Sequence, residues 1–398
     1  MNRLDNLNIK LHSLVILRNL LSNDVIKKLS ELLTIKDKSP IEQVSCYSSF
    51  VNHLFNENIN LSDYILDLIL DDENIFIMRQ AQRIEIDDNI KECIINELKI
   101  LEEISQLTSK EVKNLIKYDS YLPSWKNSKR TDFYSIYMEK VENLSTLGYG
   151  IYSKHHIFSL TDNKISPILN PDNIRLSDLF GYNKERKAVV DNTLSFLSGK
   201  PAANVLLYGD SGTGKSSTVK AIANEFKEKG LRLIEISRDN LQAIPIVIDE
   251  ISKNPLKFIL FIDDISFQKN NKEFGVLKSL LEGSASSKSP NLLVYATSNR
   301  KHLIKENFSE RDGDDIHINE TIQETVSLSE RFGLSVYFSR PNKEEYLMIV
   351  NRLAKQYKID IKDQELNYEA ERYALLRNGR SPRIARQFIE NLKGKALN

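Results

Sequence analysis

The chain has 398 residues, of which 41% are hydrophobic and 28% are charged, and its formal net charge at pH 7 is zero. This length predicts about two or three domains, the composition excludes a disordered or fibrous protein, and the neutral charge argues against a general polyanion binder. No apolar run approaches the ~20 residues that span a bilayer, and the first residues lack a signal-peptide core, so we expect a cytoplasmic protein without a membrane span.

The first 170 residues are predicted to form a mainly helical region. Apolar residues recur at helical spacing over four stretches, residues 11–33, 41–54, 61–70 and 90–115. The first glycine is Gly148, and only two prolines precede it, Pro40 and Pro123, which is typical of a helical bundle or array. We interpret residues 1–170 as a region that binds a protein partner, and the sequence does not identify that partner.

A stretch rich in aromatic side chains follows, over residues 118–152, and basic side chains are interleaved with it. The aromatic residues are Tyr118, Tyr121, Trp125, Phe133, Tyr134, Tyr137, Tyr149 and Tyr152. Such a mixture can stack on and neutralise single-stranded nucleic acid. Because the basic residues are few and no nucleic-acid motif frames them, we favour an aromatic packing surface between domains.

From residue 171 to 340 the sequence alternates between strand and helix patterns. Strands are predicted over residues 204–208, 232–236, 258–263, 291–297 and 334–338, and helices over residues 184–197, 215–226, 240–251 and 272–281. The strands are nearly unbroken apolar runs, as buried parallel strands require. The order predicts an α/β domain, a parallel sheet with helices on both faces. A further helical segment begins near residue 343.

Residues 204–218, NVLLYGDSGTGKSST, combine an apolar strand, a glycine-rich turn and the start of a helix. The residues expected to bind nucleotide here are Gly209, Asp210, Ser211, Gly212, Thr213, Gly214, Lys215, Ser216 and Ser217. The glycines permit a tight turn whose N–H groups face phosphates at the positive helix end. Lys215 can reach the β- and γ-phosphates and Ser216 can ligate Mg²⁺, so the pattern predicts a site for ATP and Mg²⁺.

Polar residues follow two later strands of the same domain. In FILFIDDISF, Asp263 is placed to associate with Mg²⁺, and Asp264 is placed to orient or deprotonate the attacking water. The alternative for Asp264 is a strand-end turn that caps the next helix. Asn299 follows the strand over residues 291–297 and can hold that water or sense the γ-phosphate.

Two arginines complete the set of candidate catalytic and binding residues. Arg331, in SLSERFGL, is expected to reach the γ-phosphate of a neighbouring subunit if the chain assembles into a ring. Arg383 follows Pro382 at a helix start and can point back at the phosphates. The alternative for each is a surface arginine. The acidic stretch over residues 309–325 is interpreted as a solvated loop, or else as a partner-contacting loop.

Together, these motifs resemble an AAA+ ATPase module over residues 204–397. The segments GKPAANVLLYGDSGTGKSS, FIDDISF, YATSNRKHL, SLSERFGL and GRSPRIARQFI are, as a set, similar to a bacterial group of AAA+ proteins described only as a domain of unknown function. The resemblance implies a P-loop NTPase core with a parallel five-stranded sheet over residues 171–340 and a C-terminal helical lid over residues 341–398. It implies homo-oligomers with nucleotide at subunit interfaces, and it places Gly181 and Tyr182 near the adenine.

Within the resemblance, residues 209–216 form the Walker A motif and residues 259–264 the Walker B motif. Asn299 is sensor one, Arg331 the arginine finger and Arg383 sensor two. One departure is that most hydrolytic members have Glu where this chain has Asp264. The leading hypothesis is an ATPase that couples nucleotide state to remodelling or assembly of a protein partner. The alternatives are a DNA-associated initiator or helicase-loader-like switch, which we do not favour, and an ATP-gated scaffold with little hydrolysis.

Overall fold

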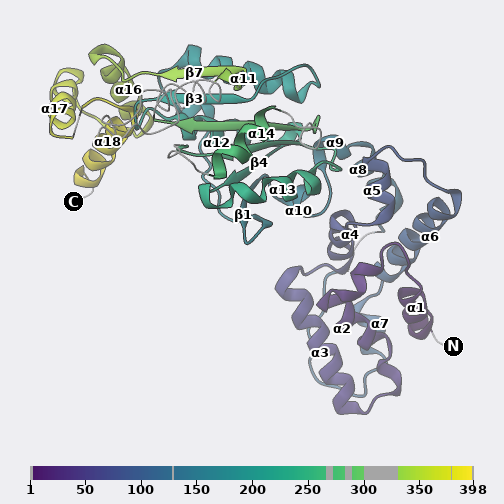
Figure 1. Ribbon diagram of the computed structural model, residues 1–398. Helices are drawn as coiled ribbons and strands as arrows, with labels where there is room; N and C mark the ends of the chain where they lie inside the picture. The colour runs from purple at the N-terminus through teal and green to yellow at the C-terminus, as the bar shows by residue number, and fades with distance from the viewer. Residues whose placement is uncertain are drawn as a thin grey trace. The chain divides into compact units, whose positions relative to one another are not determined.

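The computed structural model describes residues 3–127, 130–265, 272–282, 289–299, 330–377 and 379–396 (Figure 1). The chain divides into two compact units, the first formed by residues 1–154 with 253–255 and the second by residues 155–252 with 256–398. The acidic stretch over residues 309–325 lies outside the described residues. The domain boundaries drawn from the sequence, at residues 170 and 340, stay predictions. None of the described helices is long and apolar enough to cross a membrane.

The N-terminal unit is helical, as its apolar periodicity predicts. Its helices are α1 (Arg3–His12), η1 (Arg18–Ser22), α2 (Asp24–Leu33), η2 (Ile35–Asp37), α3 (Pro40–Glu57), α4 (Leu61–Asp71), α5 (Ile75–Ala81), α6 (Asp88–Ser105), α7 (Ser109–Lys113), α8 (Phe133–Glu142), α9 (Leu144–Leu147) and α10 (Ile151–Lys154). Capping side chains set several helix starts, among them Ser39 and Thr108, each of which forms a capping box.

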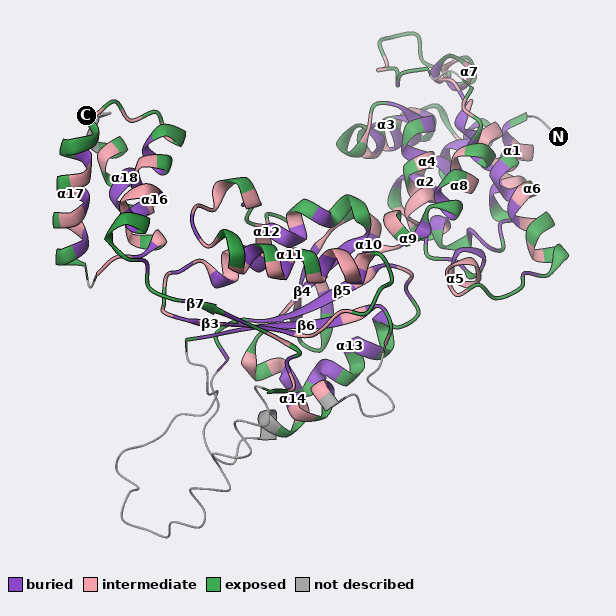
Figure 2. Cartoon of the chain, turned by 90° about the horizontal axis from the view of Figure 1, so that it is seen from above, coloured by how far each residue is buried: buried purple, intermediate pink, exposed green. Residues whose placement is uncertain are grey.

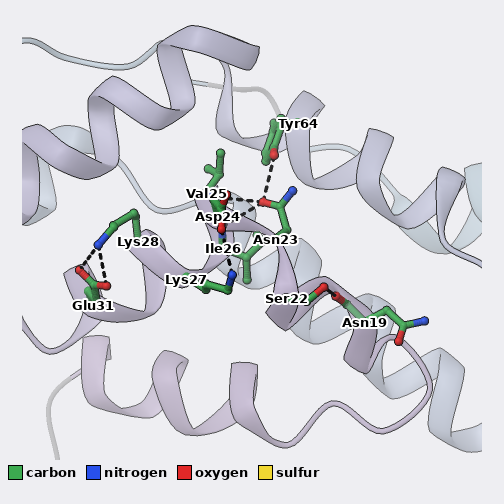
Figure 3. Close-up of polar contacts among 10 residues, drawn as sticks. All are labelled: Asn19, Ser22, Asn23, Asp24, Val25, Ile26, Lys27, Lys28, Glu31 and Tyr64. Atoms are coloured by element: carbon green, nitrogen blue, oxygen red, sulfur yellow. Dashed lines mark hydrogen bonds and ion pairs between the residues drawn. The ribbon is translucent and has the colours of Figure 1, made fainter.

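Asn23 connects two helices of this unit (Figure 3). Its side-chain oxygen accepts hydrogen bonds from the N–H groups of Val25 and Ile26, at 3.0 and 3.2 Å, and so caps the start of α2. The same oxygen accepts a hydrogen bond from the hydroxyl of Tyr64 in α4 at 3.0 Å. One amide therefore fixes both the start of α2 and the approach of α4.

The aromatic stretch is largely part of the core of this N-terminal unit, not the separate packing surface that we expected. Trp125 is 3% exposed, and its ring centroid lies 5.7 Å from that of Tyr47 and 5.2 Å from that of Phe50. Phe133 and Tyr137 are fully buried in the same core cluster. The aromatic composition of this stretch is evident from the sequence, but no local pattern indicates which helices these residues pack against.

The second unit is built on one sheet, with strands β1 (Ile157–Thr161), β2 (Lys164–Pro167), β3 (Val205–Gly209), β4 (Leu231–Ile236), β5 (Lys257–Ile262), β6 (Leu292–Ser298) and β7 (Leu334–Phe338). The strand order is β2-β1-β4-β5-β6-β3-β7, and every pair is parallel except β1 with β2. The five predicted parallel strands are confirmed. The hairpin of β1 and β2 was missed, although its turn, Asp162-Asn163, carries two positive φ angles of 51° and 59°.

Helices cover both faces of this sheet, as predicted (Figure 2). They are η3 (Leu176–Asp178), α11 (Asn183–Leu197), α12 (Lys215–Phe226), η4 (Lys227–Lys229), η5 (Arg238–Ala243), α13 (Ile244–Ile251) and α14 (Lys272–Glu282). In Figure 2, α11 and α12 lie on one face and α13 and α14 on the other. The helix predicted over residues 240–251 divides into η5 and α13. Because both faces are covered, most residues of β3 and β5 are apolar and buried.

Three C-terminal helices form a small bundle with its own core, which confirms the predicted helical segment. They are α16 (Lys343–Gln356), α17 (Asp363–Leu376) and α18 (Pro382–Ala396). Buried residues from all three, including Tyr346, Ala370 and Ile389, form one cluster. Asn342 caps α16 in a capping box with Glu345, directly after the sheet ends.

We predict that Asn23→Ala lowers the free energy of unfolding by about 1–2 kcal/mol, because α2 loses its cap and the Tyr64 hydroxyl loses its acceptor. Urea unfolding of the full chain, followed by circular dichroism, measures the change. Asn23→Asp is the matched control, since it keeps an acceptor at this place, and we expect it to stay within about 0.5 kcal/mol of the wild type. Equal losses in both variants would contradict the capping role.

Candidate functional site

The predicted phosphate loop connects the end of β3 to the start of α12. Gly209, Gly212 and Gly214 have φ angles of +130°, +77° and +91°, which L side chains rarely adopt. A Cβ at Gly209 would clash with the Phe338 carbonyl oxygen of β7. Only glycine therefore fits at the point where the backbone leaves β3, and the chain turns tightly enough to form a cradle beside the N-terminus of α12.

Lys215 is held inside this loop. Its ammonium donates hydrogen bonds to the carbonyl oxygens of Gly209 and Asp210, both at 2.8 Å, and to Oδ1 of Asn299 at 3.2 Å. Burial lowers the pKa of Lys215, and the nearby carboxylates of Asp264, Asp210 and Asp263 oppose that shift. The loop and the end of β6 are thus connected through one cation.

The two acids after β5 meet the phosphate loop at the same edge of the sheet. The Ser216 hydroxyl donates to Oδ1 of Asp263 at 2.6 Å, and the buried Thr297 hydroxyl at the end of β6 donates to the same oxygen. The structure therefore brings together the two residues that the sequence assigned to Mg²⁺. Hydroxyl and carboxylate oxygens are ligands that Mg²⁺ accepts, so this pair fits that ion.

Asp264 adopts a left-handed backbone conformation, with φ at +52°. Its N–H donates to Oγ1 of Thr297 at 2.7 Å. One carboxylate oxygen accepts a hydrogen bond from Nδ2 of Asn299 at 2.8 Å, and the other lies 3.5 Å from Nη2 of Arg238. The side chain is 62% exposed, and these contacts with Thr297, Asn299 and Arg238 fix its position.

The phosphate loop is also attached to β7 and to the C-terminal helices. The Asp210 N–H donates to the Phe338 carbonyl at 3.1 Å, and the Asp210 carboxylate accepts the Arg340 N–H at 3.0 Å. The Arg383 N–H, at the start of α18, donates to the Gly212 carbonyl at 3.2 Å. Arg383 therefore lies next to the loop, where its backbone makes the contact and its side chain is exposed. The expected contact of its guanidinium with the phosphates stays a prediction.

A cavity of about 210 Å³ lies between the phosphate loop and the C-terminal helices. It is lined by Asp178, Leu179, Phe180, Arg186, Gly212, Gly214, Ser217, Ile349, Leu353, Pro382, Arg383 and Arg386. Gly181 and Tyr182, the residues expected near an adenine, adjoin this wall. The Tyr182 hydroxyl donates to the Ser339 carbonyl at 2.7 Å, and its ring packs on Phe338. Leu179 and Phe180 line the cavity instead.

Arg331 lies at the opposite end of the strands from the phosphate loop. It precedes β7, whose first residue pairs with the first residue of β3, whereas Phe338 at the other end pairs with Gly209. Five strand residues separate the two ends by roughly 15 Å. The partly exposed Arg331 is therefore not part of the cluster around Lys215 in its own chain.

Sequence reasoning missed four residues of this site: Thr297, Arg238, Arg340 and Arg186. Arg238 and Arg340 each lie two residues after a parallel strand, β4 and β7. The rule that found Asp263 and Asn299, polar residues at the carboxyl ends of parallel strands, was available for them too. Arg186 lies one turn inside α11 and gives no such signal.

Comparisons with known proteins concern mainly this second unit. Residues 153–396 match the family described as "Protein of unknown function (DUF815)", which confirms the expected resemblance to a group of unknown function. No curated protein matches the sequence. The Thermotoga maritima RuvB Holliday junction branch migration motor is 17% identical, with a TM-score of 0.39 over 56% of this chain and 64% of that chain. The FIGL-1 AAA domain in complex with ADP is 22% identical, with a TM-score of 0.35 over 58% and 76%. The chain thus spans less than two thirds of that RuvB chain.

We predict that Gly209→Ala lowers the free energy of unfolding by at least about 2 kcal/mol, because an L side chain there is strained and its Cβ meets the Phe338 carbonyl. Gly275→Ala is the control. Gly275 lies within α14 with no atom within 4 Å of an added Cβ, so this change should be neutral or stabilising. Urea unfolding of both variants tests the expectation, and equal effects would contradict it.

Proposed function

Because this chain belongs to the family of proteins of unknown function named DUF815, we propose its function from its own site. The protein is an AAA+ ATPase that binds ATP between the phosphate loop and the C-terminal lid, hydrolyses it to ADP and phosphate, and couples that cycle to a protein partner. The observation that carries the proposal is one connected network. Ser216 bonds to Asp263, and Asn299 bonds to both Asp264 and Lys215. Thr297 joins the two groups, because it bonds to Asp263 and accepts the Asp264 N–H.

Each member of the network has a chemical task in this proposal. The N–H groups of the loop and the Lys215 ammonium bind the phosphates and offset their charge. Ser216 and Asp263 hold Mg²⁺, which when bound neutralises further phosphate charge. Asp264, fixed by Asn299 and Arg238, orients the attacking water and accepts its proton. Asp210, Ser211, Thr213 and Ser217 complete the phosphate loop, and Arg383 reaches the phosphates from the lid.

We further propose that Arg331 acts on the nucleotide of a neighbouring subunit. In its own chain it lies at the far end of β7 from the phosphate loop. A guanidinium that stabilises transition-state charge must reach the γ-phosphate, and a homo-oligomer with nucleotide between subunits supplies that contact. The N-terminal helical unit is then available to select the protein partner.

A second candidate, a nucleotide-dependent loader of nucleic-acid assemblies, rests on the paired acids and the basic lid. The sequence over residues 372–395 holds seven basic side chains against one acid, Glu390. Many of these basic side chains contact neighbours in the lid. Arg372 lies 3.3 Å from Glu369, and Arg380 bonds to Glu371. Arg377 packs over the ring of Tyr373, and Lys393 packs over the ring of Tyr357. We therefore prefer a protein partner. Salt-sensitive DNA binding by the full chain would favour the loader instead.

We predict that Lys215→Ala and Arg331→Ala each lose turnover, the arginine variant by roughly 10³-fold, and that mixing the two inactive proteins restores part of it. In a mixed oligomer, an intact phosphate loop next to an intact Arg331 forms about a quarter of the sites by random assembly. Steady-state ATPase assays against protein concentration measure this. The control is each variant mixed with itself, and no recovery in the mixture would contradict action between subunits.

Substitution of Asp264 separates an ATPase from an ATP-gated scaffold. Asp264→Asn should lower kcat by roughly 100-fold and preserve ATP affinity, because the amide keeps the shape but cannot take the proton. Asp264→Glu should turn over no faster than the wild type, since both carboxylate oxygens already have partners at the length of aspartate. Faster turnover with Glu would favour the scaffold. Single-turnover kinetics with labelled ATP give both rates.

A further inference from the structure

Arg186 is a buried cation whose partners are neutral. The residue is 7% exposed, and its guanidinium donates hydrogen bonds to the carbonyl oxygens of Leu179, at 2.8 Å, and of Gly181. Its Nε also donates to the Thr218 hydroxyl at 3.4 Å. Burial lowers the pKa of Arg186 to about 10, so the side chain stays charged near neutral pH. Burial of a charge with neutral acceptors is costly and requires a reason.

The acceptors of Arg186 lie in two segments that each contribute residues to the cavity lining, Leu179 and Phe180 in one and Ser217 in the other. Gly181 follows Phe180 directly. Thr218 lies in α12, one turn after the phosphate loop, and Nη2 of Arg186 is 3.7 Å from the position of a Cβ built on Gly214. The guanidinium therefore connects the segment over residues 179–181 to the helix that carries the phosphate loop.

That segment ends in a bend, because its last residue, Gly181, and the following Tyr182 are both left-handed. Gly181 has φ at +76° and Tyr182 has φ at +51°, and Tyr182 precedes α11 without a side-chain cap. The Tyr182 ring lies 5.7 Å from the Arg186 guanidinium, and an added Cβ at Gly181 would lie 3.2 Å from Ile349 of the lid. Arg186 contacts both sides of the bend, through carbonyl bonds on one side and the aromatic ring on the other.

We propose that Arg186 is a positioning residue for the base of the bound nucleotide. The inference rests on the proposed ATP site. The cavity wall beside the phosphate loop is apolar at Leu179, Phe180, Ile349 and Leu353, which suits the flat faces of a nucleobase. Arg186 keeps this wall in register with the phosphate loop, so that base and triphosphate bind at the same time. Substitution of Arg186 then lowers the contribution of the nucleobase to ATP affinity and leaves binding of the triphosphate by the loop largely unchanged.

The experiment compares two ligands, ATP and inorganic tripolyphosphate, by calorimetric titration of the full chain with Mg²⁺ present. Arg186→Gln removes the charge and most donors, whereas Arg186→Lys keeps the charge but cannot reach all three acceptors. We expect both variants to lower the affinity for ATP at least about 10-fold and the affinity for tripolyphosphate by less than about 3-fold. A loss of about 10-fold is what the loss of a hydrogen bond from a charged donor typically causes. The Lys variant keeps the test usable if the Gln variant does not fold.

The matched control is Arg232→Gln. Arg232 in β4 is 4% exposed, donates to the carbonyl oxygens of Lys227 and Leu231 at 2.9 Å, and has its pKa lowered by burial to about 10, but it does not line the cavity. If Arg186 has only a structural role, substitution at Arg186 and at Arg232 should give the same ratio of ATP to tripolyphosphate affinity. If the wild type binds ATP but the Arg186 variants keep the wild-type ratio of ATP to tripolyphosphate affinity, the inference about Arg186 is overturned and the proposed function stands. Absence of ATP binding by the wild type would overturn the proposed function.

Discussion

The parallel register of β3, β5 and β6 is the constraint on which the site depends. Because parallel strands end at one edge of a sheet, the turn after β3, the two acids after β5 and the polar residues after β6 arrive at the same place. The hydrogen bonds from Ser216 and Thr297 to Asp263 are the direct result. A shift of β5 by one residue would turn its acids to the opposite face and break both bonds.

The same constraint explains how much the sequence could reveal. Runs such as residues 258–262 are apolar because both sheet faces are covered, so these strands and the acids after them were predictable. The hairpin of β1 and β2 is short and partly exposed, and its pattern is correspondingly weak. The contacts of Arg186 and Arg340 depend on which segments meet after folding, and no local pattern encodes that. The same holds for the core position of Trp125.

Three arginines near the site each contact a different part of it. Arg186 connects the cavity wall to α12, Arg238 faces Asp264, and Arg340 lies where β7 leads into the lid. Gly379, at φ +106°, leaves room for the Arg340 guanidinium, because an added Cβ would lie 3.0 Å from Nη1. The C-terminal helices and the segment that leads into them are thus attached to the phosphate loop. The Gly212 carbonyl accepts the Arg383 N–H, and the Asp210 carboxylate accepts the Arg340 N–H. A change in the position of the C-terminal helices would alter the loop directly, as the proposed coupling of nucleotide state to shape requires.

Asp264 stands where the resemblance to AAA+ ATPases leads us to expect Glu, and it fits its own surroundings. Its left-handed backbone turns the side chain toward Asn299 and Arg238, and its N–H is satisfied by Thr297. Asp and Asn tolerate this conformation better than residues with longer side chains. A glutamate would carry its carboxylate one methylene beyond both partners and would fit the backbone less well. The shorter acid is therefore matched to the bend after β5. In the proposed mechanism, that bend as much as the side chain sets how far the carboxylate reaches toward the attacking water.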